Sequence, residues 1–313
     1  MKLAWRRALR ALAGLIIVVL TAGCASSGSP GGPQTSGSPR LRIVAAFYPF
    51  EFVAEQVAGA RAQVDSLTAP GAEPHDLELT PRQVATLVTA DLVIYEHSFQ
   101  PAVDEAVAQA ERDRRNLLDT ATVVPLEDHG RLPDAPRAGD GLDPHVWLDP
   151  IRLATIASAV ADQLGAVDPP HAADYRIGAA RLHDQLRGLD DRFQTGLASC
   201  RRTTFITTHA AFSYLAKRYG LTQIAVGGLS PDAEPSPARI AEVQRAARAS
   251  GATTIFYETL VSPAVAESLA NDLRLRVDVL DPIEGITPAS RGTDYLSIMA
   301  ANLTALREAD ACR

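Results

Sequence analysis

This 313-residue chain lacks the short motifs that mark the commonest nucleotide-binding and acyl-transfer sites. It contains no Gly-rich phosphate loop, no Gly-x-Ser-x-Gly segment and no internal short-period repeat. It also has no His-Glu-x-x-His segment, the helix motif of one large class of zinc hydrolases. These absences remove the usual support for nucleotide and acyl-transfer chemistry, and they weaken the case for a zinc hydrolase.

Positive charge is in short supply. Asp and Glu number 37 against 30 Lys and Arg, which gives a formal net charge of −7. Basic residues and no acid stand in the leader that ends before Cys24, so the rest of the chain is more acidic than this total suggests. An acidic body disfavours nucleic acid as a partner and suits a cation as ligand. We expect a monomer that binds no nucleic acid.

The apolar run at the amino terminus, Ala11–Leu20, is too short to cross a bilayer, which needs roughly 20 residues. It follows a basic stretch and precedes Thr21-Ala22-Gly23-Cys24, the order of a secretory signal. The last three residues resemble the bacterial lipobox, in which the Cys is acylated and becomes the mature first residue, although Thr21 stands where Leu is usual. We predict a signal peptide over residues 1–23 and an exported protein, at the cell surface or in the periplasm, anchored to the membrane through a lipid on Cys24.

Cysteine is scarce, and the residues after Cys24 lack any core-forming pattern. Residues 24–40 are rich in Gly, Ser and Pro and are predicted to form a flexible tether. Only Cys200 and Cys312 remain beyond it, and export would place them in an oxidising compartment. We predict that they pair, with two inert buried thiols as the alternative.

From Arg42 onward, short β-branched runs alternate with helical patterns, which is typical of α/β layers around mostly parallel sheets. Four candidate strands precede residue 130 and four follow residue 200. They are Arg42–Ala46, Gln63–Leu67, Asp91–Tyr95, Thr122–Leu126, Thr203–Thr207, Gln223–Val226, Thr253–Tyr257 and Arg276–Leu280.

One long helical pattern separates the two sets of strands. Asp168 is its expected N-cap, with Pro169 at the first helical position, and Gly178 and Gly188 weaken it by about 1 kcal/mol each relative to Ala. We therefore predict an α/β fold of two similar lobes, residues 41–167 and 199–313. Each lobe is a small, mostly parallel sheet flanked by helices, and one linking helix over 168–198 joins them.

A capping residue followed by Pro predicts several other helix starts. These pairs are Thr80-Pro81, Asp149-Pro150, Ser236-Pro237 and Ser262-Pro263.

Three of the seven histidines stand where a loop or strand leads into a helix. His75 follows the second candidate strand, His145 lies just before the helix that Asp149 caps, and His209 follows Thr203–Thr207. Ligands of open parallel sheets gather at the carboxyl ends of strands, so we expect the three imidazoles to line a cleft between the lobes. Three imidazoles plus one oxygen make a tetrahedral set that suits Zn²⁺.

A carboxylate from the second lobe is expected to complete the set. Asp281 stands just past the last candidate strand, and Pro282 favours an extended backbone before it, so we predict Asp281 as the fourth ligand. Glu258, after the strand Thr253–Tyr257, is a candidate to hydrogen-bond a ligand from behind or to compete for the metal, or else is a solvated loop acid. His97 is a candidate to line the cleft.

The segments that carry these residues resemble a known family. Pro74-His75-Asp76, Asp143–Pro150, Thr208–Tyr214 and Leu280-Asp281-Pro282 are similar, in order, to the metal-binding segments of zinc and manganese substrate-binding proteins of ABC transporters. Ser230–Ser236 resembles a further signature of that family, and the likeness covers about residues 42–310.

The resemblance implies a non-enzymatic, two-lobed protein that captures a metal ion and hands it to a membrane permease. It also implies Zn²⁺ as the cargo, because zinc binders commonly have His at the third ligand position, here His209, where manganese binders have a carboxylate. Many zinc binders carry a long His-rich loop, whereas residues 127–144 offer only His129 before His145. A manganese or iron binder, a zinc hydrolase and a surface adhesin on the same scaffold remain as alternatives.

Overall fold

The computed structural model describes residues 40–109, 116–128, 141–231 and 234–313. The predicted signal peptide, the tether, the lipidated Cys24 and His129 lie outside these residues. In the part of the chain that is described, no helix has the length and apolar character needed to cross a membrane.

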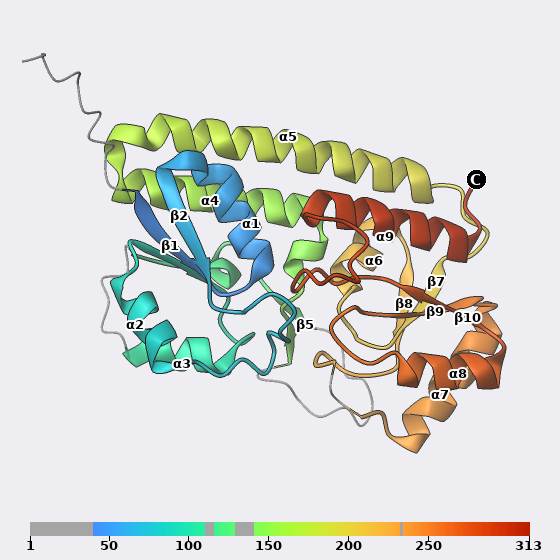
Figure 1. The fold of residues 1–313 in the computed structure, drawn as a ribbon. Coiled ribbons are helices and arrows are strands. Elements are labelled where there is room, and N and C mark those ends of the chain that lie inside the picture. Colours follow the sequence, from blue (N-terminus) through green and yellow to red (C-terminus); the bar gives the residue numbers. More distant parts are fainter. Residues whose placement is uncertain (1–39, 110–115, 129–140, 232–233) are drawn as a thin grey trace, which may run out of the picture. The chain divides into compact units, whose positions relative to one another are not determined.

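Two four-stranded sheets, both fully parallel, form the framework (Figure 1). The first has the order β2-β1-β3-β4. The second, β10-β9-β7-β8, reads β8-β7-β9-β10 from its other edge, so the two sheets have the same strand order. The strands are β1 (Leu41–Ala45), β2 (Ala62–Ser66), β3 (Leu92–Tyr95), β4 (Leu117–Asp119), β7 (Thr204–Thr207), β8 (Thr222–Ala225), β9 (Thr254–Tyr257) and β10 (Arg276–Val279). The predicted α/β class with two similar parallel sheets is confirmed.

Helices flank both sheets, and several begin where a capping residue and a Pro predict. The helices are α1 (Tyr48–Ala58), α2 (Pro81–Thr89), α3 (Pro101–Gln109), α4 (Pro150–Val167), α5 (Ala172–Leu197), α6 (Ser213–Tyr219), α7 (Pro237–Ser250), α8 (Ala264–Leu273) and α9 (Tyr295–Asp310). The Thr80, Asp149 and Ser236 side chains each accept a hydrogen bond from a backbone N–H of the first turn. At α8 the hydroxyl of Ser262 accepts from the N–H of Ala264.

The fourth strand of the first sheet lies earlier than predicted. Leu117–Asp119 pairs with β3, whereas the predicted strand 122–126 begins within a 3-10 turn, Thr120–Thr122. The Asp119 side chain starts that turn by accepting from the N–H of Ala121. Val124 is nevertheless buried, so its β-branched side chain serves the core without joining the sheet. A short antiparallel pair, β5 (Glu127–Asp128) and β6 (Leu142–Asp143), follows.

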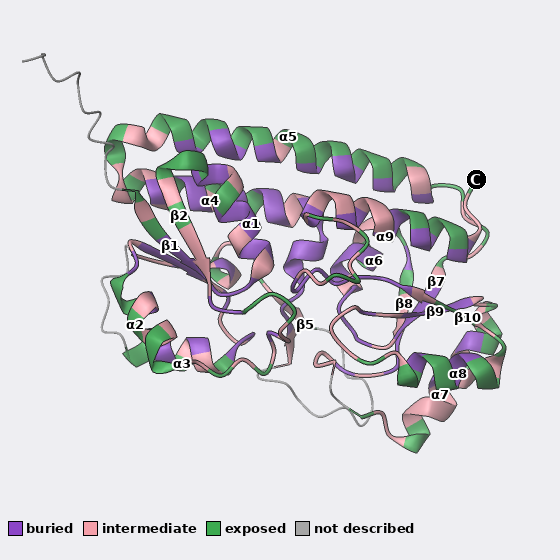
Figure 2. Ribbon diagram, viewed as in Figure 1, coloured by how far each residue is buried: buried purple, intermediate pink, exposed green. Residues whose placement is uncertain are grey.

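Helix α5 is the long connection between the two sheets, and it runs along both halves of the molecule (Figure 1). One side of it is buried against α4, α1 and α9, and the opposite side is exposed (Figure 2). Its beginning differs from the prediction, because Asp168 ends α4 and opens a 3-10 turn, Pro169–His171, without a side-chain cap. The Asp168 carboxylate instead accepts from the hydroxyl of Tyr175 at 2.5 Å.

The carboxyl-terminal residues return to the end of α5. A disulfide joins Cys200 to Cys312, which confirms the predicted pairing. The backbone N–H groups of Arg201 and Arg202 also donate to the carbonyl oxygen of Asp310. The last helix, α9, is therefore fixed to the second sheet and packs on α5.

Gly178 has a packing role that its low helix propensity hides. A Cβ at this position would clash with the carbonyl oxygen of Val57 in α1, whereas a Cβ at Gly188 would meet nothing. We expect Gly178→Ala to lower the free energy of unfolding by about 1–3 kcal/mol through overpacking. Gly188→Ala is the matched control and should raise it by up to about 1 kcal/mol. Urea unfolding of both variants checks this pair, and a stabilising Gly178→Ala would contradict the close approach of α5 to α1.

Candidate metal centre

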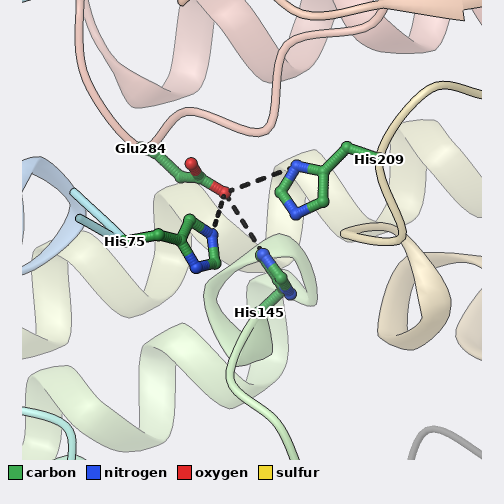
Figure 3. A group of neighbouring side chains, drawn as sticks. All are labelled: His75, His145, His209 and Glu284. Carbon is green, nitrogen blue, oxygen red and sulfur yellow. Dashed lines mark ion pairs between the residues drawn. The ribbon is translucent and has the colours of Figure 1, made fainter. Parts of the chain in front are cut away.

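Three histidines from three separate segments meet in the interior (Figure 3). His75 lies in the loop between β2 and α2, His145 follows β6, and His209 follows β7. Their ring centroids are 5.5 Å apart for His75 and His145, 5.4 Å for His75 and His209, and 4.8 Å for His145 and His209. The expected convergence of the three imidazoles is therefore present in the geometry.

A carboxylate from the loop after β10 completes the group, and it belongs to Glu284. Its Oε1 atom lies 3.2 Å from Nε2 of His145, 3.5 Å from Nε2 of His75 and 3.9 Å from Nδ1 of His209. All three ion pairs drawn in Figure 3 start from this one oxygen. Three nitrogens and one oxygen thus surround a common point.

The group is deeply buried and incompletely hydrogen-bonded. His145 and Glu284 are fully buried, and His209 is 2% exposed. Nε2 of His75, Nε2 of His145 and both carboxylate oxygens of Glu284 have no hydrogen-bond partner within the described residues. Buried polar atoms without partners are costly, so several of them converging on one point indicate a site that a cation would satisfy.

The histidines and Glu284 shift one another's pKa values. Burial opposes ionisation of Glu284, but the facing imidazoles of His75 and His145 hold the pKa of its carboxyl well below the usual value. Burial likewise opposes protonation of His145, but the adjacent carboxylates of Asp143 and Glu284 raise its pKa to about 9. Burial lowers the pKa of His75. Protons and a metal ion would therefore compete for His145 in particular.

Asp143 fixes the ring of His145 from behind. Its Oδ1 lies 2.8 Å from Nδ1 of His145 and also accepts from the backbone N–H of that residue at 2.9 Å. Its other oxygen accepts from the hydroxyl of Ser213, and its carbonyl oxygen accepts from Tyr214. This arrangement leaves Nε2 of His145 facing Glu284.

Replacing this support should weaken metal binding without removing a ligand. For Asp143→Asn we expect zinc affinity to fall about 10- to 100-fold, the usual cost of losing a carboxylate that orients a ligating imidazole. Titration against a competing zinc chelator measures it. Asp162→Asn, at an exposed position on α4, is the control. Equal affinities for the two variants would mean that Asp143 does not orient the site.

His209 is held by two contacts. Its Nδ1 lies 3.3 Å from Oε2 of Glu258, and its Nε2 lies 2.9 Å from the carbonyl oxygen of Leu229. Glu258 directly follows β9, the neighbour of β7 in the sheet, which explains why the two side chains meet. Glu258 is 2% exposed, so it is a buried neighbour of the site rather than a solvated loop acid.

Asp281, predicted as the fourth ligand, is not in the group of metal-binding side chains that the structure brings together. Its carboxylate accepts from the N–H of Ile283 at 2.8 Å and from the hydroxyls of Ser290 and Thr259. Its backbone N–H and carbonyl pair with the side-chain amide of Asn302. Asp281 therefore shapes the loop that carries Glu284.

That loop is strained next to Glu284. Ile283 has φ of 60°, a left-handed conformation that a β-branched residue rarely adopts, and it is fully buried. The carbonyl of Pro282 accepts from the indole N–H of Trp147 at 2.7 Å, which ties the loop to the His145 segment. The sequence offered little indication of Glu284. A strand followed by Asp-Pro does not predict that the next residue, Ile283, adopts a left-handed backbone and turns the chain inward.

His97 lies outside the group. Its side chain is 45% exposed, and its Nδ1 lies 2.7 Å from Oδ2 of Asp119. It forms no contact with the three grouped imidazoles among the described interactions.

The chain is similar to known zinc-binding and zinc-uptake proteins. The family model for ZnuA, described as zinc-uptake complex component A, periplasmic, matches residues 43–309. The zinc-binding lipoprotein AdcA of Streptococcus pneumoniae is 34% identical over 287 residues, which cover 88% of this chain and 57% of AdcA. The chain thus spans little more than half the length of that relative. The high-affinity zinc uptake system protein ZnuA of Bacillus subtilis is 31% identical, with 93% of each chain covered.

Solved structures share the fold. The Zn(II)-bound ZnuA-like domain of S. pneumoniae AdcA superposes with a TM-score of 0.73 at 34% identity, over 87% of this chain and 99% of that domain. The laminin-binding protein Lmb of Streptococcus agalactiae has a TM-score of 0.76 at 29% identity, over 86% of this chain and 99% of Lmb. Lmb is described as a bifunctional protein with adhesin and metal-transporting activity.

Proposed function

Since the chain belongs to the ZnuA family of zinc-uptake components, we propose that it captures Zn²⁺ outside the cytoplasm and delivers the ion to an ABC permease for import. Zn²⁺ is the cargo of this protein. His75, His145, His209 and Glu284 are the residues that we assign to hold it.

One observation carries this proposal: three buried imidazoles and one buried carboxylate converge, with four of their nitrogen and oxygen atoms unpartnered. Three nitrogens and one oxygen match the tetrahedral coordination that Zn²⁺ accepts, with bonds of about 2.0–2.2 Å. The binding residues lie in segments that follow β2, β6, β7 and β10, so the ion would link segments that are far apart in the sequence.

The family is one of non-enzymatic solute-binding proteins. The donor set agrees, because catalytic zinc keeps a position open for water whereas Glu284 supplies a fourth protein ligand here. We therefore set aside the zinc hydrolase alternative.

Nitrogen-rich coordination favours Zn²⁺ over Mn²⁺ and Fe²⁺. Isothermal titration of the metal-free chain with each ion tests the choice. We expect one Zn²⁺ per chain and an affinity for Mn²⁺ at least about 100-fold weaker, following the order of divalent-metal affinities at nitrogen sites. Equal or tighter Mn²⁺ binding would overturn the assignment of zinc as the cargo.

Export and anchoring through Cys24 complete the proposed role. AdcA, a relative, is named as a lipoprotein, and the Ala22-Gly23-Cys24 segment of this chain fits acylation. Cys24→Ser should release the protein from the membrane fraction and lower zinc uptake by the cells that express it. Retention of the variant in the membrane fraction would contradict the lipid anchor.

A role as a surface adhesin is a second candidate, because Lmb, at 29% identity, is described as both an adhesin and a metal transporter. Solid-phase binding to laminin, measured for the zinc-free chain and for the zinc-loaded chain, tests this role. Absence of saturable binding would remove this candidate and leave the transport role untouched.

A further inference from the structure

A second cluster of side chains adjoins the histidines. Glu73, Glu258 and Glu284 each have a carboxylate oxygen within 4.8 Å of the others. They come from three separate segments, namely the loop after β2, the end of β9 and the loop after β10. Glu284 belongs to both groups, so the carboxylate cluster and the histidine site share one residue.

The three carboxylates have oxygens left over after their protein contacts. Oε1 of Glu73 accepts from the N–H of His75 at 3.0 Å, and Oε2 of Glu258 faces His209 at 3.3 Å. Oε1 of Glu284 serves the imidazoles (Figure 3). The remaining atoms, Oε2 of Glu73, Oε1 of Glu258 and Oε2 of Glu284, have no partner within the described residues.

Burial makes these leftover oxygens informative. Glu258 is 2% exposed and Glu284 fully buried, so water does not satisfy their unpartnered atoms at the surface. Buried carboxylates close to one another repel unless a cation or a proton lies between them. Divalent cations take carboxylate oxygens as ligands. Zn²⁺ binds carboxylate oxygen at about the same distance as imidazole nitrogen, but less tightly.

The cluster also has a direction. Glu73 is partly exposed as a residue, although its Oε2 atom is buried, whereas Glu258 and Glu284 are buried throughout. Glu73 is therefore the member of the cluster nearest the surface, and a zinc ion arriving from that side would reach it before Glu258 and Glu284. Glu284 could stay bound to the ion during the transfer, because one of its oxygens belongs to the carboxylate cluster and the other faces the imidazoles.

We propose that Glu73, Glu258 and Glu284 form a carboxylate site that receives the incoming Zn²⁺ before it moves onto His75, His145 and His209. This inference rests on the proposed zinc-binding function and assigns the route by which the ion reaches the site. Negative charge that lines a binding cleft raises the association rate of a cation by about 10- to 1,000-fold.

Stopped-flow measurement of zinc transfer from a fluorescent chelator to the metal-free chain tests the route. For Glu73→Gln we expect the association rate constant to fall at least about ten-fold, a larger factor than any rise in the dissociation rate constant. The variant keeps an oxygen that can accept from the N–H of His75. Glu78→Gln, which removes an equal charge from an exposed position in the same segment, should associate as fast as the wild type.

A second variant separates charge from loop shape. Glu73→Asp keeps the carboxylate and should associate faster than Glu73→Gln. The inference is overturned if Glu73→Gln associates within two-fold of the wild type, if its defect lies mainly in dissociation, or if Glu73→Asp is as slow as Glu73→Gln. Failure of the wild-type chain to bind zinc at all would overturn the proposed function as well, so the two failures are distinguishable.

Discussion

Glu284→Gln is expected to weaken zinc binding about 100-fold. Four ligands share a binding free energy of about 10–16 kcal/mol in structural zinc sites, so one of them accounts for about 3 kcal/mol. The amide keeps the shape of the side chain but loses the negative charge that the three imidazoles face. Titration against a chelator of matched affinity measures the change.

Asp281→Asn is the matched control for Glu284→Gln. Asn keeps an oxygen that can accept from the N–H of Ile283, so the loop should hold its shape while one negative charge is lost. We expect its zinc affinity to stay within about ten-fold of the wild type, below the loss caused by removing a ligand. If Asp281→Asn lost more affinity than Glu284→Gln, Asp281 would be the fourth ligand and the assignment of Glu284 would be wrong.

Zinc affinity is expected to fall at least about 100-fold between pH 8 and pH 6. Zinc binds deprotonated imidazole, so any proton on His145 must leave before the ion can bind. Because Asp143 and Glu284 raise the pKa of His145 to about 9, this competition operates across the whole interval and costs about ten-fold per pH unit. Glu258 and Glu284 also raise the pKa of His209 against the effect of burial, which adds to the loss.

The sign of this effect follows from the shifted groups. His145 carries a proton in the metal-free state, and lower pH makes the displacement of that proton by zinc less favourable, while the low pKa of Glu284 keeps its carboxylate ionised. His97→Ala should show the same pH slope as the wild type, because His97 is half exposed and lies apart from the group. Chelator competition at several pH values checks both proteins, and a flat profile for the wild type would contradict a histidine site.

The sequence patterns predicted most of the framework that positions the site. Seven of the predicted strands overlap the observed ones to within one or two residues, because most of them are short runs rich in β-branched or aromatic residues. The exception, 122–126, shows the limit of that signal: Val124 is buried by the core without pairing in the sheet. A segment that is only buried and a segment that pairs in a sheet show the same apolar pattern in the sequence, so the pattern alone does not distinguish them.

The site itself was only partly predictable. Each of the three histidines precedes a helix or turn. His75 and His209 follow strands of the parallel sheets, whose carboxyl ends gather such junctions, whereas His145 follows β6 of the antiparallel pair. The position of Glu284 depends on the left-handed Ile283, on the hydrogen bond that the Asp281 carboxylate accepts from it and on the one that Trp147 donates to Pro282, which come from tertiary packing. Likewise, the need for Gly178 depends on the approach of α1 and is invisible within α5.

A crystal structure of the zinc-loaded chain, with anomalous data collected at the zinc absorption edge, tests the central claim most directly. We predict one strong anomalous peak per chain, about 2.0–2.2 Å from one nitrogen of each of His75, His145 and His209 and from one oxygen of Glu284. A peak elsewhere in the molecule, or one coordinated by Asp281 in place of Glu284, would contradict it.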